Sequence, residues 1–119
     1  MNRQRPQKVA SALKREIAQA CLLESDNPLL KQLAITRVEV SSDLRVARVY
    51  YTNCINPSAD RAMMARQLAR ASTYLMRFAR ARISMKHFPE LRFAYDTDAE
   101  KLGRIEDILR QIKTPEQEP

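Results

Sequence analysis

The chain has 119 residues, of which 45% are hydrophobic and 29% are charged, and it carries a formal net charge of +7. A chain of this length and composition can bury enough apolar surface to fold without metal or disulfide staples, which excludes a disordered protein. No apolar run approaches the roughly 20 residues of a membrane span, and the first residues lack the apolar core of a signal peptide. We expect one intracellular domain, with its core over about residues 6–112 and flexible ends at residues 1–5 and 114–119.

The chain has few of the residues that metal sites and enzymes use. Cys21 and Cys54 are far apart in sequence and His87 is the only histidine, so a structural zinc site is not expected. We interpret both cysteines as small buried hydrophobic residues, since free cysteine usually packs in this way. Gly103 is the only glycine, which excludes a glycine-rich phosphate loop. We expect no metal, no cofactor and no enzymatic activity.

The first predicted helix spans about residues 6–24. Pro6 suits a first helical turn, and apolar residues then recur every three or four positions, which is the spacing of one buried helix face. These residues are Val9, Leu13, Ile17, Ala20 and Cys21. Residues 25–28 are expected to end this helix, and residues 29–33 form a short apolar lead-in to the next element.

Two strands follow and predict a β-hairpin. Thr36, Val38 and Val40 alternate with charged residues, as in a half-buried strand, and residues 41–43 make the turn. The second strand, residues 46–53, also alternates, so its two faces differ. One face has Ala47, Val49 and Tyr51, and the other has Arg48, Tyr50 and Thr52.

The segment from Arg61 to Pro89 holds all of the net charge. It contains seven basic residues and no acidic one, while the rest of the chain has 14 of each. Asn56 is the expected cap of a helix that begins at Pro57 and runs into this segment. Its apolar stripe is Met64, Leu68, Ala71, Leu75 and Phe78. Arg66, Arg70, Thr73, Arg77 and Arg80 repeat that spacing on the opposite face, roughly 200° around the helix.

The absence of acids distinguishes this basic face from an ordinary solvated helix face. A solvated face usually mixes signs, because opposite charges at i, i+4 stabilise a helix by a few tenths of a kcal/mol. A polyanionic partner would explain why the repulsion among these basic side chains is tolerated. Nucleic acid is the commonest such partner for a soluble chain with a pI near 9.8. Ser72 and Thr73 can bond back to carbonyls one turn earlier, so we expect a bend that divides this segment into two helices.

A third strand and a last helix complete the chain. Pro89 opens the strand and Asp96 closes it, with Leu91, Phe93 and Tyr95 alternating with Arg92 and Ala94. Thr97 or Asp98 is the expected cap of the last helix, and residues 114–119 are a polar tail. The apolar stripe of this helix is Leu102, Ile105, Ile108, Leu109 and Ile112.

The predicted order is therefore α-β-β-α-α-β-α. We expect the amphipathic helices to cover one face of a three-stranded sheet, which makes a two-layer α+β domain. Within this order, strand, helix, turn, helix, strand is the core of a KH domain, where nucleic acid lies across the junction of the two helices. Several unrelated two-layer folds share the same order.

Segments along the chain resemble the ribosome-binding factor A family, small bacterial assembly factors of the small ribosomal subunit with a KH-like fold of type II. They occur in the family's order between residues 6 and 112. The matching segments are VEVSSDL at 38–44, ARVY at 47–50, RAS at 70–72, RAR at 80–82, PELRFAYD at 89–96 and GRI at 103–105.

One position departs from the family pattern. The family marks the helix junction with Ala-x-Gly, and here Thr73 stands in the place of the glycine. A β-branched residue resists positive φ and a close backbone approach, so we expect a shallower bend. The hydroxyl of Thr73 either replaces the contact that the glycine backbone makes, or Thr73 is simply a tolerated helical residue.

The resemblance implies a set of RNA-facing residues at the junction, in the helix and loop beyond it, and on two strands. They are Arg70, Ala71, Ser72, Thr73, Arg77, Arg80, Arg82, Lys86, Arg48 and Arg92. The arginines are expected to contact phosphates, which position RNA without reading its bases. Tyr50 is a further candidate for stacking on a base, although exposed strand tyrosines are common.

Three functional hypotheses remain open. The resemblance implies a monomeric, cytoplasmic factor that binds the immature small ribosomal subunit and assists maturation of its ribosomal RNA, with no membrane partner. A basic adaptor that meets an acidic protein or an anionic membrane is the second hypothesis. An RNA-processing enzyme, the third, would need carboxylates or a metal site within the basic face, and residues 61–89 contain no carboxylate.

Overall fold

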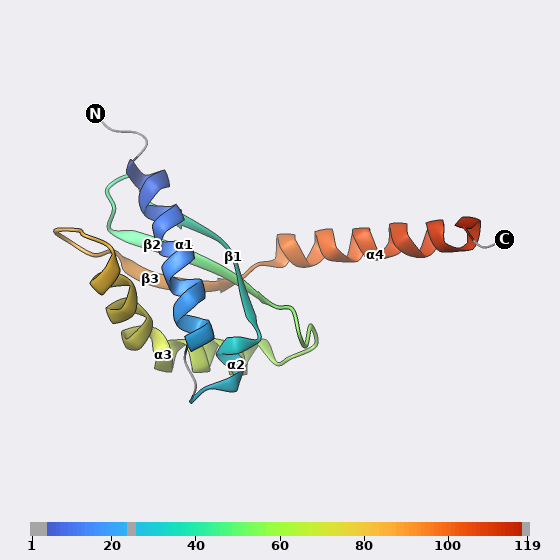
Figure 1. Cartoon of the computed structure of the whole chain (residues 1–119), viewed down its shortest axis with the longest axis horizontal. Helices are drawn as coiled ribbons and strands as arrows, with labels where there is room; N and C mark the ends of the chain where they lie inside the picture. Colours follow the sequence, from blue (N-terminus) through green and yellow to red (C-terminus); the bar gives the residue numbers. More distant parts are fainter. Residues whose placement is uncertain (1–4, 24–25, 118–119) are drawn as a thin grey trace.

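The computed structural model describes the backbone of residues 5–23 and 26–117, and the side chains in these ranges except those of residues 107 and 112–117. The elements are α1 Arg5–Leu23, α2 Pro28–Lys31, β1 Leu33–Val40, β2 Val46–Asn53, α3 Arg61–Arg82, β3 Glu90–Tyr95 and α4 Thr97–Gln117 (Figure 1). Flexible ends were predicted at residues 1–5 and 114–119, and of these residues 1–4 and 118–119 lie outside the described residues. Residues 24–25, at the predicted helix stop, also lie outside them.

The sheet has three strands in the order β1-β2-β3. β1 and β2 pair antiparallel and form the predicted hairpin, whereas β3 pairs parallel with β2. A parallel pair needs a crossover connection, and α3 supplies it. β1 starts at Leu33, where the sequence suggested only a lead-in, and its register shifts between Ile35 and Arg37. A mixed α+β fold with a three-stranded sheet is therefore confirmed.

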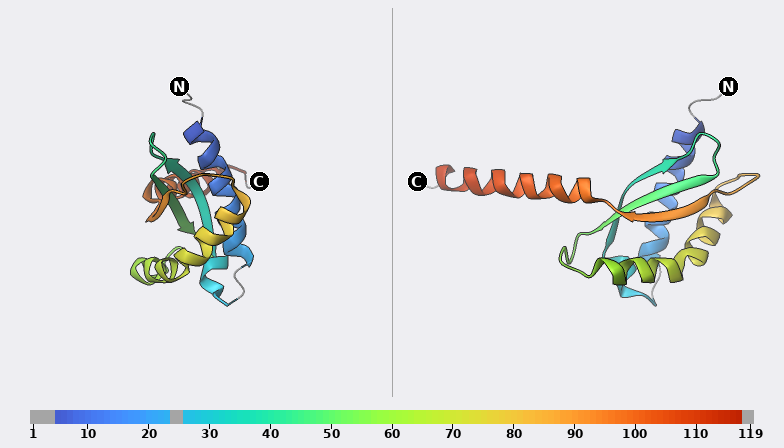
Figure 2. Two further views of the ribbon diagram at one scale, coloured as in Figure 1. Left: turned by 90° about the vertical axis from the view of Figure 1, so that its left-hand side faces the viewer. Right: turned by 180° about the vertical axis from the view of Figure 1, so that it is seen from behind.

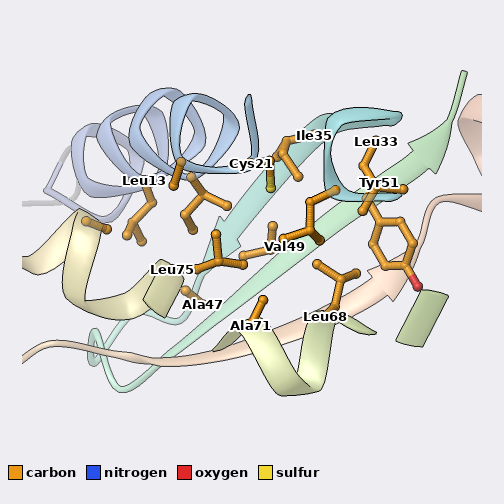
Figure 3. Packing of buried hydrophobic residues seen from close by; sticks show 14 of the residues in the cluster. Leu13, Cys21, Leu33, Ile35, Ala47, Val49, Tyr51, Leu68, Ala71 and Leu75 are labelled. Atoms are coloured by element: carbon orange, nitrogen blue, oxygen red, sulfur yellow. The ribbon is translucent and has the colours of Figure 1, made fainter. Parts of the chain in front are cut away.

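α1 and α3 pack together against one face of this sheet (Figure 3). Leu13 and Ile17 of α1, Leu68 and Leu75 of α3, and Val49 of β2 are completely inaccessible to solvent. The apolar stripe predicted for α1 is buried along its whole length. Helical and strand periodicity thus identified most of the core correctly, because each core element buries one face.

The end of β2 explains why the two cysteines differ. Inward-facing residues alternate along β2 and end with Asn53, which is buried and donates a hydrogen bond to the side chain of Gln32 (3.0 Å). The next residue, Cys54, therefore points outward and is exposed, so the prediction that both cysteines are buried is wrong for Cys54. Cys21 is buried as predicted, and this burial raises the pKa of its thiol to about 11.

The helix starts differ from the predicted ones in two places. α2 is a single helical turn capped by Asn27, whose side-chain oxygen accepts a hydrogen bond from the backbone of Leu29. α3 begins at Arg61 and not at Pro57, because Asp60 is its cap and accepts hydrogen bonds from the backbone N–H groups of Ala62 and Met63. Asn56, the predicted cap, instead begins a turn that ends at Ala59.

α3 is one continuous helical segment, so the predicted pair of consecutive helices is wrong and the order becomes α-α-β-β-α-β-α. Its ribbon nevertheless changes direction about halfway along (Figure 2). The hydroxyl of Ser72 donates a hydrogen bond to the carbonyl of Ala69 (2.8 Å), which is the back-bonding expected at a bend. The backbone hydrogen bonds tolerate this bend, and the helix does not break.

α4 leaves the domain instead of covering the sheet (Figure 1). Only Asp96 separates β3 from α4, so the chain has no loop in which to turn back. The carboxylate of Asp96 accepts a hydrogen bond from the N–H of Ala99 (3.0 Å), which makes Asp96 the cap in place of Thr97 or Asp98. α4 also continues to Gln117, beyond the start of the predicted polar tail.

The predicted apolar stripe of α4 is therefore not part of the core. Leu102, Ile105, Ile108 and Leu109 are each 50–61% exposed. Ile112, the last residue of the predicted stripe, has its side chain outside the described part of the chain. The expectation that all the amphipathic helices cover the sheet is wrong for α4, because α1 and α3 already fill that face.

Candidate nucleic-acid interface

The outer face of α3 is a row of exposed basic side chains. Met64, Leu68, Ala71, Leu75 and Ala79 of the same helix are buried, which leaves the opposite face in solvent. The exposed row consists of Arg66, Arg70, Arg77 and Arg80. The side chains of these four arginines make no hydrogen bond or ion pair with the backbone or side-chain groups that the structure describes. We call them the arginine row.

The predicted junction lies beside the edge strand of the sheet. Ser72 and Thr73 line a shallow groove of about 260 Å³ together with Met76 of α3 and Glu90 and Leu91 of β3. Thr73 is exposed and Ser72 is half-buried. The groove therefore lies between the predicted junction on α3 and the edge strand β3, and Arg70 and Arg77 are close in sequence to its lining residues Ser72, Thr73 and Met76.

Ala71, the remaining junction residue, differs from its neighbours. It is only 9% exposed and belongs to the core cluster. Its methyl group packs against the interior, so it offers little surface to an RNA chain. A small residue at this position permits close packing of the bent helix on the domain.

The two ends of α3 carry arginines that the protein itself binds. Arg61 pairs with the carboxylate of Glu100, and its guanidinium lies 4.1 Å from the ring centroid of Tyr95. Arg82 donates a hydrogen bond to the carbonyl of Phe78 (3.0 Å), and its guanidinium lies 3.5 Å from the centroid of the Phe78 ring. The Nε atom of Arg82 also lies 3.8 Å from Glu16 of α1. Arg82, a predicted RNA contact, thus stabilises the end of α3.

Arg48 and Arg92 lie on the other side of the sheet. They are cross-strand partners on β2 and β3, on the face that α1 and α3 do not cover. Arg92 makes an ion pair with Glu90 (3.0 Å), and both arginines line a hollow of about 330 Å³ beside Glu39. The predicted site is therefore divided between two faces of the domain, with Arg48 and Arg92 on one and the arginine row on the other. The order of these residues in the sequence did not indicate this division.

Tyr50 lies on the same outer face of the sheet, but its ring is already occupied. The guanidinium of Arg37 lies 4.0 Å from the ring centroid. Arg37 is held there by ion pairs with Glu39 (3.1 Å) and Asp96 (3.5 Å). A base would have to displace Arg37 or stack on the opposite face of the ring.

Lys86 lies in the loop between α3 and β3, on the rim of a hollow that also includes Arg5 and Arg45. Neither of these two arginines was predicted as a site residue. Arg5 begins α1 and Arg45 lies in the β1–β2 turn, so no local sequence pattern connects them with Lys86. Their proximity arises only from the packing of three distant segments.

Within the described residues, no group of three or more His, Cys, Asp or Glu side chains is placed to hold a metal ion. None of the helices in the described ranges is long and apolar enough to cross a membrane. What the arrangement offers chemically is positive charge on a rigid helix beside a shallow groove. A surface of this kind binds a nucleic acid through the phosphate backbone of the nucleic acid.

Comparisons with known proteins agree with this geometry. The family model described as ribosome-binding factor A matches residues 5–109. The protein of that name from Halothermothrix orenii is 32% identical over 98% of this chain and 95% of its own. The crystal structure of ribosome-binding factor A from Thermus thermophilus has a TM-score of 0.64 at 26% identity, and the match covers 76% of this chain and 94% of that one.

A further similar structure is a homology model of the Thermus thermophilus protein fitted into an electron cryo-microscopy map of its complex with the 30S subunit. It has a TM-score of 0.57 at 29% identity, and the match covers 71% of this chain and 88% of that one. These structural similarities confirm the KH-like fold.

Proposed function

Because the chain belongs to the ribosome-binding factor A family, we propose that it binds the immature small ribosomal subunit and assists the maturation of its ribosomal RNA. The relative from Thermus thermophilus, fitted into a map of a 30S complex, supports the choice of the small subunit as partner. We further propose that the chain acts in the cytoplasm as a monomeric, single-domain factor and not as an enzyme.

The observation that carries this proposal is the arginine row on α3. These exposed guanidinium groups have no partner among the described residues, although an unpaired row costs repulsion within the helix. RNA phosphates would relieve that repulsion and release bound counterions. We assign phosphate contacts to Arg70, Arg77 and Arg80, with Ser72 and Thr73 holding the RNA chain at the groove.

The proposed role also follows from the limited ability of this surface to recognise RNA bases. Arginines on a helix contact the phosphate path, which positions RNA without identifying its bases. Selectivity must then come from the shape of the RNA in the particle. We therefore propose that the protein recognises a pocket of the immature subunit, and that final folding of the RNA reshapes this pocket and releases the protein.

We expect the purified protein to sediment with immature small subunits and to bind mature ones less, because the pocket is lost on maturation. Sedimentation with matched immature and mature subunits at equal salt measures this difference. Equal occupancy of both particles would contradict the proposal and favour a general RNA-binding protein. Preferential binding to anionic vesicles over protein-free small-subunit RNA would instead favour the adaptor hypothesis.

The same assay includes a variant that tests the surface itself. Arg77→Glu with Arg80→Glu should abolish binding to immature subunits, because it reverses two charges at the centre of the proposed contact. Both residues are exposed, so thermal unfolding should change by no more than about 1 kcal/mol. Lys31→Glu with Lys101→Glu changes the net charge equally at exposed positions on α2 and α4, and it should leave binding nearly unchanged.

A further inference from the structure

A second positively charged surface lies at the end of the domain opposite to α4. The start of α1, the β1–β2 turn and the α3–β3 loop come together there (Figures 1 and 2). They enclose a hollow of about 630 Å³ whose rim includes Arg5, Arg45, Lys86 and His87. Half-buried Leu44 and Phe88 supply apolar lining. We call this the basic hollow.

The charges of the basic hollow are poorly balanced. The side chains of Arg5, Lys86 and His87 make no hydrogen bond or ion pair with the described part of the chain. The only acid in the lining is Asp43, which lies 3.9 Å from Arg45 and accepts a hydrogen bond from the hydroxyl of Ser41 (2.7 Å). This bond, together with the hydrogen bond from the backbone N–H of Arg45, lowers the pKa of Asp43. Its carboxylate therefore stays charged and is bound by groups of the turn itself.

The backbone around the basic hollow is firmly held. The hydroxyl oxygen of Ser41 accepts hydrogen bonds from the backbone N–H groups of Arg45 (3.2 Å) and Val46 (3.1 Å). The carbonyl of Arg45 accepts one from the N–H of Glu90 (2.8 Å), which ties the turn to β3. Leu44 has φ 62°, a left-handed conformation that is uncommon for leucine and persists only where surrounding contacts impose it. Arg45 is thus presented from a firmly held turn.

We propose that the basic hollow binds a phosphate group of the RNA backbone, as a second contact beyond the arginine row. The inference rests on the proposed function. The second half of α3 runs toward this end of the domain and continues into the loop that contains Lys86 (Figure 2). An RNA chain that follows Arg77 and Arg80 therefore reaches Lys86 and Arg45 next. The apolar lining accepts the sugar of the same nucleotide.

The test compares two double variants that remove the same charge. Arg45→Ala with Lys86→Ala alters the basic hollow, and Lys31→Ala with Lys101→Ala is the matched control on α2 and α4. The side chain of Arg45 is 84% exposed, so thermal unfolding should not change. Binding to protein-free small-subunit RNA is measured for both variants over a series of salt concentrations.

The hollow variant should bind about tenfold more weakly at low salt, and its log-log salt slope should be flatter by about 0.7–0.9, because one phosphate contact is lost. The control variant should match the wild type. Wild-type behaviour of the hollow variant, in an assay where Arg77→Glu with Arg80→Glu loses binding, would overturn this inference and leave the proposed function standing.

A second readout does not depend on RNA. Titration of the wild-type protein with inorganic phosphate, followed by NMR, should shift the backbone amides of Lys86 and His87 saturably, and the hollow variant should abolish these shifts. Absence of wild-type RNA binding alone would reject the proposed function. Absence of saturable phosphate shifts in the wild type would reject the basic hollow as a phosphate site.

Discussion

α1 and α4 are amphipathic helices of 19 and 21 residues, yet only α1 lies against the sheet. Leu13 and Ile17 of α1 are fully buried, whereas Ile105 and Leu109 of α4 are half exposed. The apolar spacing of the two helices is equivalent, so the difference comes from their connections. α4 follows β3 after one residue and points away from a face that α1 and α3 already cover (Figure 1). An apolar stripe indicates that a helix has a face to bury, but not that the domain has room for it.

The first turn of α4 is nevertheless attached to the domain. Asp96 caps the helix and accepts a hydrogen bond from Thr36 (2.5 Å), and Glu100 pairs with Arg61 of α3. Asp98 lies 3.6 Å from Arg37. The attachment of α4 therefore consists of charged groups around its start, while the attachment of α1 consists of apolar packing along its length. Three substitutions separate these two kinds of attachment.

The largest effect is expected from Leu13→Ala in α1. Leu13 is 0% exposed, and truncation of such a residue removes its burial and leaves a cavity, at a cost of about 2–5 kcal/mol. Urea denaturation of the wild type and the variant measures this cost. A loss below about 1 kcal/mol would mean that α1 is less firmly packed than its buried stripe indicates.

An intermediate effect is expected from Asp96→Ala, which removes the cap of α4 and its hydrogen bond with Thr36 of β1. Loss of the cap and of the partner of Thr36 should cost about 1–3 kcal/mol at pH 7. Urea denaturation gives this value, with Asp98→Ala as the control, since the side chain of Asp98 is 74% exposed. A cost equal to that of the control would show that the buried carboxylate contributes nothing.

The effect of Asp96→Ala should also depend on pH. Burial by itself would raise the pKa of Asp96, but hydrogen bonds from Thr36 and Ala99 and the charge of Arg37 outweigh it and lower the pKa below its ordinary value. A lowered pKa stabilises the fold above the unfolded-state value of about 3.9, and this contribution is lost as the pH falls through the folded-state pKa. The stability difference between the wild type and the variant should therefore shrink when urea denaturation is repeated near pH 3.

The smallest effect is expected from Leu109→Ala in α4, the same chemical change as in Leu13→Ala. Leu109 is 50% exposed, and Ile105 and Ile108 beside it are also exposed, so the unfolding free energy should change by less than about 0.5 kcal/mol. The same denaturation experiment decides this. A loss similar to that of Leu13→Ala would show that the stripe is covered in solution.

The candidate site was predictable to different degrees. The arginine row follows from spacing within one helix, and the exposed positions of Arg70, Arg77 and Arg80 match the prediction. The engagement of Arg82 with Glu16 was not predictable, because the two residues lie on different helices. The separation of Arg48 and Arg92 from the arginine row was equally hidden, since it depends on which face of the sheet the helices cover.

Sequence alone determined the local features of this protein: the stripes of α1 and α3, the hairpin, and the charged segment that holds the whole net charge. These features depend on periods of two and 3.6 residues, which local backbone geometry imposes. Only the tertiary structure decided that α4 projects from the domain, that α3 bends without breaking, and that Arg5, Arg45 and Lys86 share one hollow. The physical reason is that these three features depend on contacts between segments far apart in sequence. They also depend on which apolar surface of the sheet other helices already cover.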